Sequence, residues 1–184
     1  MADTGVKYAV SCTETSTGIS WTNLSNGAGS NDTDATTVVL FDGEASKSII
    51  LSNFSCNLPT DSTINGIQVE VRESCVNDSR ATGAWTNIRL MLDGIAVGNN
   101  KAVSIPEINS IKTTVVYGGI SDLWGTTPTY TQINNSNFGI TLKAIDADAL
   151  GDSTTISLYW LRVTIYYTDN SNTVKKHTMF FTCC

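Results

Sequence analysis

Strict alternation of apolar and polar side chains is the feature that most constrains the fold of this chain. In the stretch 64–72, Ile67, Val69 and Val71 share one parity, while the charged or amide residues between them share the other. Successive side chains of an extended strand point to opposite faces, so this pattern is typical of a strand with one buried face. The stretches 86–92 and 138–142 alternate in the same way. We therefore predict strands over all three.

A longer candidate strand runs from Thr154 to Thr168, and its apolar parity changes midway. Ile156 and Leu158 share one parity, whereas Leu161 and the alternating apolar residues after it share the other. One inserted residue reverses which side chains face the core. The sequence therefore predicts one long strand with a bulge or bend near Tyr159 and Trp160.

Closely spaced extended segments separated by turns predict the class of the fold. Weaker strand candidates cover residues 7–12, 19–24, 37–41, 48–53, 101–105 and 112–117, and turn residues such as Asp-Gly and Leu-Pro separate them. With no apolar stripe at helical spacing, we expect an all-β fold, an antiparallel β-sandwich that is jelly-roll-like. We expect one sandwich domain over residues 1–168, with residues 1–6 as an N-terminal arm and residues 169–184 as a C-terminal tail.

Charge and hydropathy disfavour two classes of partner. The net charge is −6 at pH 7, whereas binding to nucleic acid depends on cationic groups that displace counterions from phosphates. No apolar run is long enough to span a membrane, and the first residues lack the pattern of a signal peptide. We expect a protein made in a cytoplasm, with no nucleic-acid or membrane partner.

Side chains that carry catalysis or bind metals are sparse. The chain has an odd number of cysteines without CxxC spacing: Cys12, Cys56, Cys75, Cys183 and Cys184. It has one histidine, His177. This set disfavours a zinc site and a histidine-dependent triad, so we expect no enzyme activity, no cofactor and no metal. Closely spaced carboxylates leave a calcium site open as an alternative, although aspartate also favours turns; they are Asp32 and Asp34, and Asp146, Asp148 and Asp152.

The glycine-rich loop from Tyr117 to Pro128 stands out between two predicted strands, and it contains Trp124. Aromatic residues could form a sugar-stacking platform, although core or interface packing is their more common fate; they are Trp85, Tyr117, Trp124, Tyr130, Tyr159 and Trp160. We expect Trp160 in the core, and we expect Trp124 at an interface or a ligand or, as the anchor of its loop, against the core. The candidate partner contacts are Tyr117, Asp122, Trp124, Tyr130, Phe180 and Phe181.

A series of short blocks runs through the chain between residues 20 and 168. The blocks are Phe41 to Ala45, Leu51 to Phe54 followed by Leu58 and Pro59, Ile64 to Arg72, Asn99 to Ala102, Tyr117 to Gly125, Asn137 to Ile140 and Val163 to Tyr167. Each block alone suits many sandwiches. In their order and number they resemble a β-sandwich module of structural proteins in the virions of tailed bacteriophages.

The resemblance implies a non-enzymatic virion component that is commonly a homotrimer. We expect a capsid decoration, or cement, protein that binds the major capsid protein and copies of itself. The alternative is a tail or fibre module that recognises a host surface glycan through loop aromatics such as Trp124. The tail places Lys175 and Lys176 before Phe180 and Phe181, and it could dock in a groove of a neighbouring subunit.

Overall fold

The computed structural model describes residues 1–77, 82–102, 108–147 and 152–171. The strands are β1 (Ala2–Asp3), β2 (Lys7–Tyr8), β3 (Ser11–Glu14), β4 (Thr36–Phe41), β5 (Ile49–Ser52), β6 (Thr63–Asn77), β7 (Gly83–Leu92), β8 (Ile95–Val97), β9 (Thr113–Gly119), β10 (Gly139–Asp146) and β11 (Ser153–Thr168). A short 3-10 helix, η1 (Leu24–Gly27), and one α-helix, α1 (Tyr130–Asn134), complete the described elements.

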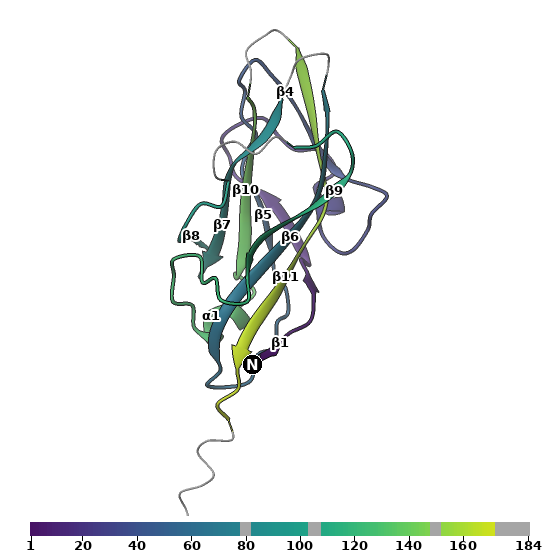
Figure 1. Ribbon diagram of the computed structural model, residues 1–184. Helices are drawn as coiled ribbons and strands as arrows, with labels where there is room; N and C mark the ends of the chain where they lie inside the picture. The colour runs from purple at the N-terminus through teal and green to yellow at the C-terminus, as the bar shows by residue number, and fades with distance from the viewer. Residues whose placement is uncertain (78–81, 103–107, 148–151, 172–184) are drawn as a thin grey trace, which may run out of the picture.

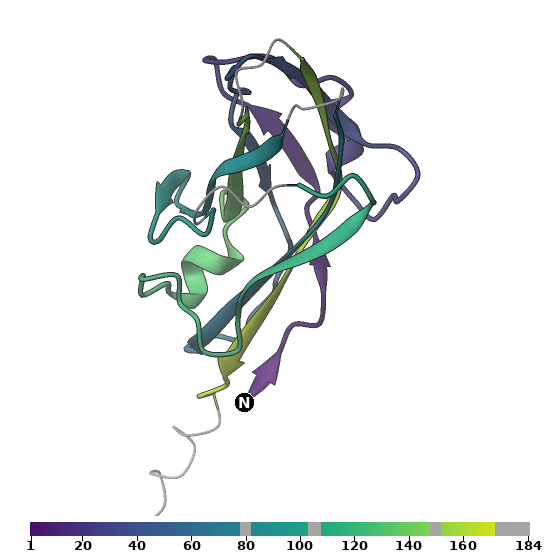
Figure 2. The same cartoon turned by 45° about the horizontal axis from the view of Figure 1, so that its top comes forward.

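The strands form two antiparallel sheets that pack face to face, so the predicted all-β sandwich is confirmed (Figure 1). Sheet A contains β4, β11, β6 and β9 in that order, and β1 and β2 also pair with β11. Sheet B has the order β3-β5-β10-β7-β8. The arrangement of β4-β11-β6-β9 against β5-β10-β7-β8 is the strand order of a jelly roll. Figure 2 shows β6, β9 and β11 running together in one layer.

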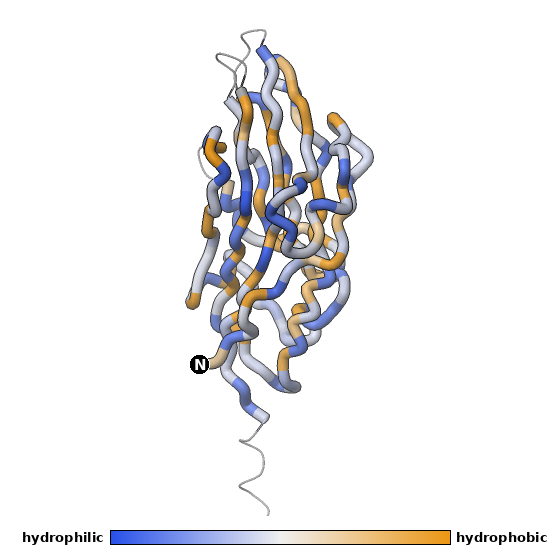
Figure 3. The backbone as a smooth tube through the Cα atoms, turned by 90° about the vertical axis from the view of Figure 1, so that its right-hand side faces the viewer, coloured by the Kyte–Doolittle hydropathy of each residue, from blue (hydrophilic) through white to orange (hydrophobic). Residues whose placement is uncertain are grey.

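The predicted irregularity in the last strand is present. In the pairing of β11 with β6, the register shifts between Leu158 and Trp160, which leaves Tyr159 as the extra residue. Leu158 and Leu161 therefore both face the core, although they differ in parity. Figure 3 shows the alternation of apolar and polar residues along the long strands that fixes the two faces of each sheet.

Side chains from both sheets fill the space between them. The indole rings of Trp21 and Trp85 stack with their centroids 6.1 Å apart. The ring centroids of Phe54 and Phe138 lie 5.7 Å apart. Apolar residues of β6, β10 and β11 that share the inward parity are fully or almost fully buried: Ile67, Val69, Val71, Ile140, Leu142, Ile156, Leu158, Leu161, Val163 and Ile165. One core therefore joins the two sheets.

Three sequence-based expectations about individual segments are corrected. Residues 1–6 do not form a separate arm, because Ala2 and Asp3 pair with Tyr167 and Tyr166 of β11. The segment 19–24 is not a strand; it makes isolated bridges at Ile19 and Thr22 before η1 begins. Residues 101–102 are likewise outside any strand, and the rest of the expected strand 101–105 lies outside the described residues.

The end of β11 lies beside the start of β6 and near the N-terminus (Figure 1). Thr168 pairs with Thr63, and β11 ends there. The loop that follows β9 leads from sheet A to α1, which lies at the same end of the sandwich (Figure 1). This end and the outward face of sheet A carry the two surfaces described next.

Candidate partner-binding surface

The face of sheet A that points away from the core is the first candidate surface, and it is called the outer face below. Its residues alternate with the buried ones, so strand register sets which of them are neighbours. Across the sheet, Tyr8 pairs with Arg162, Arg162 with Glu70, and Glu70 with Val116. Because this row crosses β2, β11, β6 and β9, one ordered set of side chains covers the width of the sheet.

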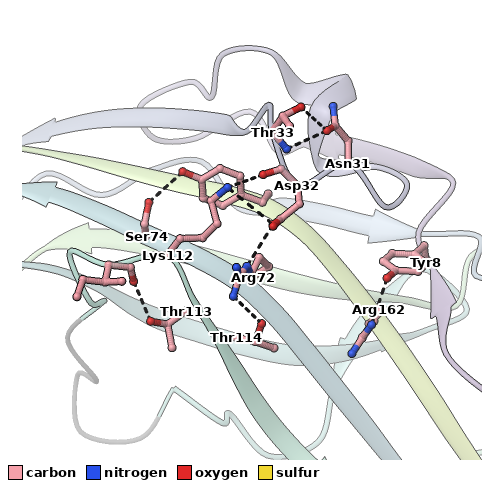
Figure 4. Close-up of polar contacts among 12 residues, drawn as sticks. Tyr8, Asn31, Asp32, Thr33, Arg72, Ser74, Lys112, Thr113, Thr114 and Arg162 are labelled. Atoms are coloured by element: carbon pink, nitrogen blue, oxygen red, sulfur yellow. Dashed lines mark hydrogen bonds and ion pairs between the residues drawn. The ribbon is translucent and has the colours of Figure 1, made fainter.

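Arg162 organises an aromatic and charged cluster on this face. Its guanidinium donates to Glu70 over 2.7 Å and to the hydroxyl of Tyr8 over 3.2 Å, a contact that Figure 4 shows. The guanidinium carbon lies 4.8 Å from the ring centroid of Trp160, and Tyr8 packs edge-on against the same indole. The hydrogen bond to Glu70, above all, raises the pKa of Arg162. The side chain is therefore a fixed cation held against two aromatic rings.

Asp32 ties the loop between η1 and β4 to the same face (Figure 4). Its carboxylate accepts a hydrogen bond from Nε of Arg72 over 3.2 Å, and Lys112 donates to its backbone carbonyl. The Lys112 ammonium also lies 3.9 Å from the ring centroid of Tyr159, whose hydroxyl contacts Ser74. The loop between η1 and β4 is thus anchored to the sheet at this point.

An exposed apolar band occupies the part of the outer face near the start of β11. Thr155 of β11 pairs with Val39 of β4 on one side and with Val76 of β6 on the other. Two residues earlier in β11, Ser153 pairs with Phe41 of β4. Their exposed fractions are 44% for Val39, 51% for Phe41 and 65% for Val76. Single exposed apolar residues are normal, whereas adjoining ones beside polar residues are typical of interaction sites. We call these three residues the apolar band.

The second candidate surface is a pocket of about 560 Å³ at the end of the sandwich where α1 lies. It is lined by the start of β6 and by the loop that leads into α1: Asp61, Ser62, Thr63, Ile64, Leu123, Thr127, Pro128, Thr129, Tyr130 and Thr131. Thr129 caps α1 by accepting from the backbone N–H of Gln132, while the Gln132 side chain accepts from the N–H of Thr129. This capping box fixes the pocket wall next to Tyr130.

The glycine-rich loop is shaped around Trp124, as its sequence suggested, but the ring points inward. Trp124 is 0% exposed, and its indole N–H donates to the carbonyl of Ile67 over 2.9 Å. Gly118 has φ of +72°, and a Cβ there would lie 2.6 Å from Nε1 of Trp124. Trp124 itself has φ of 58°, a conformation that residues other than glycine adopt rarely. The loop is therefore built to hold this indole in the core.

Asp122 serves the same loop. Its carboxylate accepts from the N–H of Trp124 over 2.7 Å and from Lys101 over 2.6 Å, and the Lys101 ammonium lies 5.5 Å from the Trp124 ring centroid. Burial alone would raise the pKa of Asp122, but the hydrogen bonds and the charge of Lys101 lower it. The residue is thus an internal ion-pair partner that fixes the loop.

The structure corrects part of the set of predicted contact residues. Trp124 is wrong as an interface residue, since it is buried, and Asp122 is engaged within the loop. Tyr117 is half-buried against the core, and burial, with the charge of Glu73 second, raises its pKa. Tyr130 alone of the described candidates lines the pocket. The remaining two candidates, Phe180 and Phe181, lie outside the described residues.

Two other aromatic residues are buried, as the favoured interpretation of the sequence predicted. Trp85 is fully buried between the sheets, so it joins no sugar-stacking platform. Trp160 is 8% exposed, but its ring packs against Tyr8 and Arg162 and not in the cluster between the sheets. The register shift at Tyr159 places it on the outer face. Sequence reasoning missed the cluster around Arg162 and the apolar band, although outward parity in β4 and β6 carried a signal for Val39 and Val76.

Several of the thiols and carboxylates considered above are buried or paired. Burial raises the pKa of the Cys12 and Cys56 thiols to about 12. Of the carboxylates considered for calcium, Asp32 pairs with Arg72, and Asp34 accepts from Asn31. Asp146 is buried, and Asp148 lies outside the described residues. Within the described ranges, no group of three or more His, Cys, Asp or Glu side chains is arranged to hold a metal ion.

Searches against protein families, curated proteins and solved structures found no match. None of the helices in the described part of the chain is long and apolar enough to cross a membrane.

Proposed function

We propose that this protein is a non-enzymatic structural component of a tailed-bacteriophage virion, and specifically a capsid decoration protein. The observation that carries the proposal is the outer face of sheet A, which carries both the apolar band and, further along the same strands, an ordered charged and aromatic cluster. The order of the sequence blocks and the sandwich fold support it. The partner is the major capsid protein, and a second set of contacts joins copies of this chain.

The apolar band supplies a modest free energy of binding. Complete burial of one such side chain contributes about 1.5–3 kcal/mol, and these three are already partly covered. Roughly 1 kcal/mol for each is therefore available on contact with a partner. Weak contacts of this kind are sufficient on a capsid, because an oligomer that binds several capsid sites at once binds more tightly overall than any single contact does.

The charged residues of the outer face contribute to the choice of partner more than to the free energy of binding. Arg162 pairs with Glu70, and Asp32 pairs with Arg72. A partner that covers these groups meets charges that are already compensated, so the desolvation cost is lower than for isolated ions. The arrangement of an apolar patch with a polar surround is that of an ordinary protein interface.

The glycan-binding alternative depended chiefly on Trp124. The burial of that ring, and of Trp85, removes the main residues that supported a sugar-stacking platform. We therefore retain the decoration protein as the proposed function and do not carry the receptor module further.

Copy number in purified virions tests the proposal. A decoration protein is expected in hundreds of copies on the head, and adding it to heads that lack it is expected to raise their resistance to heat. A few copies confined to the tail would contradict the proposal. Light scattering at micromolar concentration is expected to give the mass of a trimer, either for the purified protein that has never been bound to capsids or for protein released from capsids.

A further inference from the structure

The pocket beside α1 is lined by both apolar and polar residues. Ile64, Leu123 and Pro128 are among the apolar ones, and Asp61 and several threonines are among the polar ones. A volume of about 560 Å³ lies within the range of sites that hold small ligands or a pair of large side chains. The pocket therefore suits a compact apolar group that is preceded or followed by polar or cationic atoms.

The described chain ends at the edge of this pocket. The side-chain amide of Asn170 donates to the backbone carbonyl of Asp61 over 2.9 Å and to the hydroxyl of Thr63 over 2.9 Å. Asp61 and Thr63 are both pocket residues. The N–H of Ser171 then donates to Asp169. These bonds fix the point from which residues 172–184 continue.

The sequence beyond that point carries groups that match the pocket. Lys175, Lys176 and His177 come first, and Met179, Phe180 and Phe181 follow. Asp61, one of the residues that line the pocket, carries the charge opposite to that of the two lysines. We propose that Phe180 and Phe181 of the same chain occupy the pocket beside α1, with the lysines held near Asp61.

Chain length and linkage favour the chain's own tail as the occupant. Fully extended, residues 172–179 span up to about 28 Å, which is ample for a segment that starts at the pocket rim. A short tether gives an effective concentration in the millimolar range. A weak apolar contact is therefore enough to keep the pocket filled within one molecule.

Disulfide trapping in the full-length chain tests this occupancy. In a Cys184→Ser background, Cys183 is the thiol next to the two phenylalanines, and Thr127→Cys places a second thiol on the pocket wall. Cys12 and Cys56 compete poorly, because burial raises the pKa of each to about 12. With oxidised glutathione as the oxidant, we expect a 127–183 disulfide, found by mass spectrometry of peptides, in a species of monomer mass.

Two controls separate occupancy from mere proximity. Thr60→Cys places an exposed thiol in the same turn region but outside the pocket lining, and we expect it to crosslink at least fivefold more slowly. Adding Phe180→Ser and Phe181→Ser to the Thr127→Cys chain is expected to reduce its rate to that of the Thr60→Cys chain. Equal rates for the two positions, no effect of the serines, or a crosslinked dimer in place of the monomer would each overturn the proposal.

Discussion

The indole N–H of Trp85 donates a 2.6 Å hydrogen bond to the carboxyl group of Glu73 in the core between the two sheets. Glu73 shares the inward parity of Val71 in β6 and is 4% exposed. Burial raises the pKa of Glu73 from 4.5 to about 7, although the bond from Trp85 acts in the opposite direction. A titratable group therefore lies inside the sandwich, where its charge affects the stability of the whole domain.

Replacing this carboxyl group is expected to stabilise the protein at neutral and alkaline pH. Because the folded pKa is raised, the contribution of Glu73 to stability is complete below about pH 4.5 and is lost as the pH rises through about 7. Glu73→Gln keeps an acceptor for Trp85 and removes the charge. We expect a gain of up to about 3 kcal/mol in the free energy of unfolding at pH 8, measured by urea denaturation.

The same pair of proteins at pH 4 provides the control, since Glu73 is then protonated in the folded state and mostly protonated in the unfolded state. The difference between Glu73→Gln and the wild-type chain should nearly vanish there. A gain of equal size at pH 4 and pH 8 would mean that the substitution acts through packing and not through the charge.

Gly118 is expected to tolerate no side chain. Gly118→Ala places a Cβ against the carbonyl of Ile67 and the indole of Trp124 at a φ of +72°. Backbone strain and the displaced ring together should lower the free energy of unfolding by about 3 kcal/mol. Gly43→Ala is the matched control, because Gly43 also has positive φ but a Cβ there meets nothing within 4 Å. Equal losses in thermal denaturation would show that the Trp124 contact is unimportant.

The outcome at particular residues shows what strand periodicity can and cannot predict. The parity change between Leu158 and Leu161 identified the bulge at Tyr159, because the sheet must keep apolar side chains toward one core. The same reasoning gave the strands and the sandwich. Alternation predicts only which face of a sheet a strand residue points to, and it predicts nothing about the conformation of a loop.

Trp124 illustrates that limit. Its inward position depends on positive φ at Trp124 and on the distant carbonyl of Ile67, and neither is visible in the local sequence. The pocket likewise joins Ile64 to Tyr130 through tertiary contact. In contrast, Val39 and Phe41 could have been identified, because apolar residues at two successive outward positions of one strand break the alternation expected of a sheet with one solvated face.

Asp122 is expected to stabilise its loop mainly as a hydrogen-bond acceptor. Asp122→Ala removes the acceptor for the N–H of Trp124 and the partner of Lys101, and should cost about 1–2 kcal/mol. Asp122→Asn retains an acceptor for the N–H and should cost less than half as much, because the ion pair with Lys101 is partly exposed to solvent. Thermal denaturation of both variants checks the order, and equal losses would assign the effect to the ion pair.

The central claim is that the outer face of sheet A binds the capsid through its apolar band. The direct measurement is the affinity for heads of the Val39→Ser, Phe41→Ser and Val76→Ser triple variant, beside a control with Val10→Ser and Ile95→Ser, which are exposed elsewhere. A loss of about 3 kcal/mol, from about 1 kcal/mol for each residue, corresponds to roughly 150-fold weaker binding for the triple variant, and we expect the control to bind as the wild-type chain does. Unchanged binding by a folded triple variant would contradict the account.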